Sequence, residues 1–140
     1  MSPFAEPILR LPWGPFLLLW GASSAGLQLL VGGAAALAAQ GAQWRSSAGL
    51  GVLVASASAL CGLLALSPGK TRAIGDWQVR WIAATVCRML AAIVGAALLY
   101  SSPPSVEAFL LALAAAHLIL LVAEAALLAK WVSGPIPPPT

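Results

Sequence analysis

The sequence predicts an all-α membrane protein with four transmembrane helices, arranged as two hairpins with both termini on the same side. The first observation is composition, because 61% of the 140 residues are hydrophobic and only 8% are charged, whereas soluble domains carry roughly a quarter charged residues. The second is the mean hydropathy of +0.94. The third is continuity: the apolar runs extend for about 20 residues, as membrane helices do, and do not alternate like barrel strands.

The four spans belong to a single membrane domain that covers the whole chain. We predict spans at residues 16–39, 48–66, 81–100 and 106–131, followed by a proline-rich tail at 133–140. Turn-forming and polar residues separate the spans. The first two spans also hold small residues four positions apart, such as Ala22 with Gly26 and Gly51 with Ala55. Such pairs let helix backbones approach closely in lipid.

Two segments allow more than one interpretation. Arg10 and the Ala36-Leu37-Ala38 triplet resemble parts of a cleaved signal peptide. The apolar run between them is longer than the roughly 7 to 15 residues of a signal core, so we favour a retained span and keep cleavage as the alternative. Before the third span, residues 77–81 are expected to form a short helical lead that lies on the membrane surface.

Basic residues are unevenly divided between the two sides of the membrane. One predicted side holds Arg45, and the other holds five: Arg10, Lys70, Arg72, Arg80 and Lys130. Positive residues favour the cytoplasmic side, so we expect a bacterial inner-membrane protein with both termini in the cytoplasm. The net charge is +3, but the basic residues are scattered singly, so we expect no nucleic-acid partner.

The main candidate site is a pair of opposite charges in the last two spans. Arg88 lies seven residues after Trp81, and Glu124 lies seven residues before Trp131. Each charge therefore lies about 10 Å below the membrane surface that its tryptophan marks, so the two are level in an antiparallel hairpin. A charge at this depth costs about 2.5–3.5 kcal/mol on insertion scales. Three interpretations are open: the two form a structural ion pair, Arg88 is presented to an acidic group on a partner or to a moving ion, or Arg88 snorkels to the inner membrane surface.

His117 is a second, weaker candidate, because it lies two helical turns before Glu124 and shares its face. This placement suggests a polar relay, and a small ion- or proton-coupled transporter using Glu124 and His117 is the alternative function. A packing histidine is the simpler interpretation. The chain has one histidine and two cysteines, so no metal site is expected, and bis-histidine haem ligation within one chain is excluded. Cys61 and Cys87 are expected to be buried without a disulfide.

Chemistry-bearing motifs are missing from the sequence. We find no serine–histidine–aspartate set, no phosphate-binding loop and no pair of acids at catalytic spacing. We therefore expect no catalytic residue and no cofactor. The expected function is that of a non-catalytic accessory or assembly protein, which acts by helix–helix contacts in the lipid bilayer with another membrane protein or a second copy of itself.

Residues 46–131 resemble the ATP synthase protein I family. The resemblance comprises a glycine-bearing second span (residues 47–51), a basic loop, and Arg88 where that family tends to carry a basic residue. The chain departs from the family at Thr85, where an acid is usual, and near Ser56, where an asparagine is common. The resemblance implies a role in assembling the rotor ring of the F-type ATP synthase, with Arg88 engaging the ion-binding carboxylate of the rotor subunit.

Overall fold

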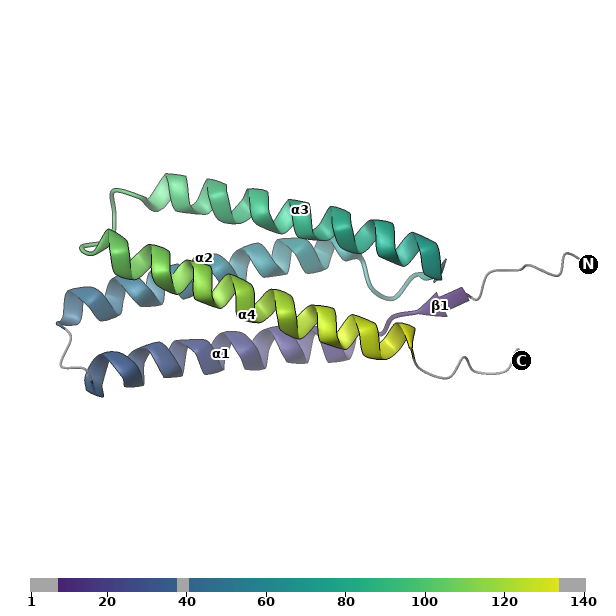
Figure 1. Cartoon of the computed structure of the whole chain (residues 1–140), viewed down its shortest axis with the longest axis horizontal. Helices are drawn as coiled ribbons and strands as arrows, with labels where there is room; N and C mark the ends of the chain where they lie inside the picture. The colour runs from purple at the N-terminus through teal and green to yellow at the C-terminus, as the bar shows by residue number, and fades with distance from the viewer. Residues whose placement is uncertain (1–7, 38–40, 134–140) are drawn as a thin grey trace, which may run out of the picture.

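The structure, a computed structural model, describes residues 8–37 and 41–133. Four long helices run antiparallel to their neighbours in sequence (Figure 1). They are α1 (Trp13–Leu37), α2 (Ala42–Leu66), α3 (Ile74–Leu99) and α4 (Val106–Val132). All four are long and apolar enough to cross a membrane. The prediction of an all-α, four-helix, multi-pass membrane protein is confirmed, while the predicted tail beyond Ser133 lies outside the described residues.

Helix α2 is the centre of the bundle. It packs extensively on both α3 and α4 and also contacts α1, whereas α3 and α4 make few direct contacts with each other. Half of the most apolar stretch of α2 is buried, against 11% for α1 and for α3. The last two helices therefore form the predicted hairpin, but it is splayed and its arms are held together largely through α2.

Two glycines of α2 allow this close packing. A Cβ atom added at Gly51 would lie 2.3 Å from the carbonyl oxygen of Phe109 in α4. One added at Gly62 would lie 3.0 Å from the carbonyl oxygen of Ala84 in α3. The predicted small-residue face of the second span is thus used inside the molecule, because it brings two neighbouring backbones close to α2.

Two side chains fasten α1 to α2. The indole Nε1 of Trp20 donates to the carbonyl oxygen of Ser56 at 2.9 Å, and the amide Nε2 of Gln28 donates to that of Gly49 at 3.1 Å. Hydrogen bonds between membrane helices contribute about 0.6–2 kcal/mol each. Gln28, the polar side chain inside the first span, is therefore a packing residue.

A small sheet that the sequence did not reveal closes one end of the bundle. Strand β1 (Ile8–Arg10) pairs antiparallel with β2 (Thr71–Ala73), so that Leu9 lies opposite Arg72. The adjoining turn is tied to the same segment, because Gly69, at φ +89°, donates its backbone N–H to the carbonyl oxygen of Leu11. Three-residue strands are too short for an alternating pattern to show in the sequence.

The helix starts also differ from prediction. α2 begins at Ala42 and not at residue 48, and α3 begins at Ile74, so the expected surface-lying lead at residues 77–81 is wrong. These residues belong to α3 itself, so their backbone groups are hydrogen-bonded within one continuous helix. Trp77 is fully buried under β1 and donates Nε1 to the carbonyl oxygen of Leu9 at 3.0 Å.

Candidate functional site

Arg88 and Glu124 form an ion pair inside the bundle. The guanidinium Nη2 of Arg88, on α3, donates to the carboxylate Oε2 of Glu124, on α4. Arg88 is 2% exposed and Glu124 is 6% exposed. Each charge therefore faces the protein and not the lipid, and the pair links two helices that otherwise have little contact.

The positions of both side chains follow from the packing on α2. On α4, Glu124 continues the buried stripe formed by Leu113, Ala116 and Leu120, which faces inward. On α3, the Arg88 side chain lies against Gly62, where an added Cβ would come within 3.1 Å of its Nε atom. The missing side chain at Gly62 thus provides the space through which the guanidinium reaches across α2.

The pair leaves part of the guanidinium without partners. Nε and Nη1 of Arg88 are buried and have no hydrogen-bond acceptor among the described residues. Breaking such a pair would strand a charge in a medium of low dielectric, which is costly. The ion pair therefore holds α3 and α4 together. The two free N–H donors of Arg88 could bind an additional oxygen acceptor.

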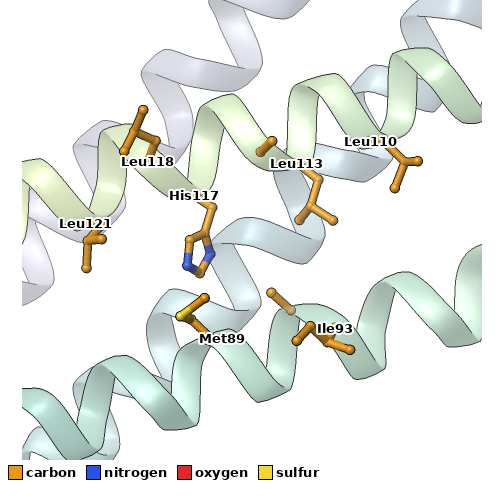
Figure 2. Close-up of a pocket in the computed structure, with 9 residues that line it drawn as sticks. Met89, Ile93, Leu110, Leu113, His117, Leu118 and Leu121 are labelled. Atoms are coloured by element: carbon orange, nitrogen blue, oxygen red, sulfur yellow. The ribbon is translucent and has the colours of Figure 1, made fainter.

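His117 lines a groove between α3 and α4. Figure 2 shows its ring extending from α4 towards Met89 on α3. Its Nδ1 atom is buried without a hydrogen-bond partner in the described part of the chain. No hydrogen bond joins His117 to Glu124 there, so the structure does not assemble the polar relay that their spacing suggested.

The groove exists because α3 and α4 pack on different parts of α2. Its volume is about 530 Å³, within the range of roughly 300–1,000 Å³ typical of small-molecule pockets. Several lining residues, including Met89, Ile93 and Leu118, are more than half exposed, so the groove lies on the lipid-facing surface. The lining residues are Met89, Ala92, Ile93, Leu110, Leu113, Ala114, His117, Leu118 and Leu121.

The expectation that the cysteines are buried is wrong. Cys61 and Cys87 are both free and exposed. In a bilayer a thiol behaves as a small apolar group, so facing the lipid carries little cost. Across residues 8–37 and 41–133, no group of three or more histidine, cysteine, aspartate or glutamate side chains is placed to hold a metal ion.

Two features of the site escaped sequence reasoning. Nothing in the sequence links Gly62 to Arg88, and the groove depends on helix positions that hydropathy does not specify. Comparisons with protein-family profiles, with curated proteins and with solved structures find no match. The function is therefore inferred from the geometry of the chain itself.

Proposed function

We propose that this multi-pass protein is a non-catalytic accessory or assembly subunit of a bacterial inner-membrane complex, acting through helix–helix contacts. The observation that carries the proposal is a small-residue face on α1 that the bundle does not use. A Cβ atom added at Gly33, which lies on this face, would have no neighbouring atom within 4 Å. The glycines of α2 at the internal contacts, by contrast, are tightly enclosed.

This face runs along the outer side of α1. The small residues Ala22, Ala25 and Gly33 are exposed, as is the larger Leu29, and the four follow one another at intervals of three or four residues, so they form one stripe of the helix. Small residues let a second helix approach closely, and close approach is a main source of helix association in lipid. The α1 stripe is thus suited to the helix of another membrane protein or of a second copy of the chain.

The closed ion pair supports a structural role for the interior. Because Arg88 is 2% exposed and bonded to Glu124, the pair can hold the splayed helices without an external partner. The partner contact is then made by the outer face of α1, and the charges keep the molecule in the shape that presents this face.

The rotor ring of the F-type ATP synthase is the specific partner that the family resemblance suggests. This partner would add a second contact to that of α1, because the rotor carboxylate would compete with Glu124 for Arg88, whose Nε and Nη1 atoms have no acceptor in the described chain. A Glu124→Gln change would then strengthen binding to the rotor subunit, because it removes the competitor. A purely structural pair would instead lose binding as the bundle loosened.

The alternative function is a small ion- or proton-coupled transporter that uses Glu124 and His117. The observation in its favour is the Nδ1 atom of His117, which has no partner in the part of the chain described. We rank it second because Glu124 is engaged by Arg88. Solute flux in proteoliposomes that survives Glu124→Gln would exclude this glutamate as the coupling group.

The assembly proposal is tested by co-purification from detergent-solubilised membranes. Gly33→Leu should remove the partner or second copy while leaving the monomer folded, since nothing lies near the added side chain. Ala97→Leu, on the exposed side of α3, adds the same side chain to another lipid-facing helix and should leave the complex intact. A wild-type chain that migrates alone, without partner or oligomer, would contradict the proposal.

A further inference from the structure

The end of the bundle that holds the start of α3 carries most of the charge in the described chain. α1 and α3 begin there, and α2 and α4 end there (Figure 1). The described ionisable residues at this end are Arg10, Lys70, Arg72, Arg80, Lys130 and Asp76. Five are basic and one is acidic, whereas the opposite end holds Arg45 and Glu107. We call the first the basic end.

Two of these arginines border one cavity at the basic end. Arg72, on β2, and Arg80, on α3, line a space of about 480 Å³ together with Asp76, Val79 and Ala83. The two guanidiniums come from separate elements, and the pairing of β2 with β1 fixes the first of them. Basic residues that are scattered in the sequence are thus gathered around one space at the membrane surface.

Arg72 is held in place and has an unused donor. Its guanidinium carbon lies 5.1 Å from the centre of the Trp77 ring, a cation–π geometry that fixes the planar group. Its Nη1 atom is buried and has no hydrogen-bond partner among the described residues. No ion pair joins Arg72 or Arg80 to a described acid; Arg88 and Glu124 form the ion pair found in that part of the chain.

The rest of the cavity leads from the charged surface into the lipid. Val79 and Ala83 continue along α3 as an exposed apolar stripe with Val86 and Leu90. These four residues are separated by three or four positions, so they share one face of the helix. The surface is therefore basic at the end of the bundle, where the two guanidiniums lie, and apolar along α3, where it faces the lipid.

From this arrangement we infer that the cavity bordered by Arg72 and Arg80 binds the phosphate of an anionic phospholipid, whose acyl chain lies on the α3 stripe. Guanidinium groups pair well with phosphate oxygens, and basic pockets at the ends of membrane helices bind anionic headgroups. Asp76 opposes an anion and so limits the affinity. A free phosphate would use the arginines but not the stripe, which is why a lipid is the better fit. The inference does not depend on the proposed assembly role.

The test is a titration of the full purified chain in mild detergent, with bound lipid measured by native mass spectrometry. The wild type should prefer phosphatidylglycerol to phosphatidylcholine with the same acyl chains. Arg72→Gln and Arg80→Gln should each weaken phosphatidylglycerol binding about fivefold. Asp76→Asn should strengthen it, because it removes the one described acid of the cavity.

Arg45→Gln is the matched control, since it removes the same charge at the opposite end of the bundle and should leave lipid affinity unchanged. An equal loss in this control, or no preference between the two lipids, would overturn the inference. Two results would assign the site to free anions and overturn its assignment to a lipid. They are displacement of phosphatidylglycerol by inorganic phosphate and an equal affinity for a short-chain analogue of the lipid. If Arg72→Gln fails to fold, Arg80→Gln and Asp76→Asn still decide, because no change in both contradicts the inference.

Discussion

At the scale of single residues, Arg88 is accommodated because two other residues and the packing of its helix act together. Glu124 neutralises its charge, Gly62 leaves room for its side chain, and the packing of α3 on α2 keeps it 2% exposed. A charge in contact with lipid would cost several kcal/mol. The site is therefore a property of three helices and not of Arg88 alone.

The sequence could predict the pair but not the space that holds it. Counting residues from Trp81 and Trp131 placed Arg88 and Glu124 at one depth, because the helical rise is fixed. No such count identifies Gly62, because it makes room for Arg88 only if its side of α2 faces α3. The same limit explains the cysteines, because hydropathy cannot tell a lipid-facing Cys87 from a buried one.

Glycine substitutions should have different effects at the enclosed positions of α2 and at the open positions of α1. Gly51→Ala should destabilise the protein by about 1–3 kcal/mol, because the new Cβ would lie 2.3 Å from a backbone oxygen. Gly26→Ala should be neutral or stabilising by up to about 1 kcal/mol, since alanine favours helix and nothing is near. Unfolding in mixed detergent micelles measures both, and equal effects would contradict the packing described.

At the scale of elements, α2 determines where the others lie. α3 and α4 are adjacent in sequence and joined by a short turn, yet both pack mainly on α2. Hydropathy predicted the existence of all four helices, because long apolar runs have few alternatives in lipid. It could not predict the order of packing, which depends on Gly51 and Gly62, or the two short strands.

The β1–β2 sheet should depend on Trp77. Trp77→Phe removes the hydrogen bond to the Leu9 carbonyl, which is worth about 0.5–1.5 kcal/mol, and it weakens the contact with Arg72. We expect the backbone amides of residues 8–10 to exchange faster with deuterated solvent, while those of α2 are unchanged. Hydrogen exchange with mass spectrometry measures this, and unchanged exchange in β1 would show that the strand is held by other contacts.

At the scale of the whole molecule, the bundle is open along the line where α3 and α4 diverge. The groove of about 530 Å³ lies between them, and the Arg88–Glu124 bond is the hydrogen bond that joins their side chains in the described structure. The pair therefore ties the two outer arms together across α2. With this tie in place, α3 and α4 keep fixed positions relative to each other.

A double-mutant cycle on Arg88 and Glu124 tests whether this ion pair holds the bundle together. Arg88→Leu and Glu124→Leu should each destabilise the bundle by about 3–5 kcal/mol, because each leaves one buried charge without its partner. The double variant should be more stable than either single variant, since it strands no charge and fills the site with apolar groups. Detergent unfolding of all four proteins provides the numbers. Additive losses in the double variant would contradict a buried ion pair at the centre of the molecule.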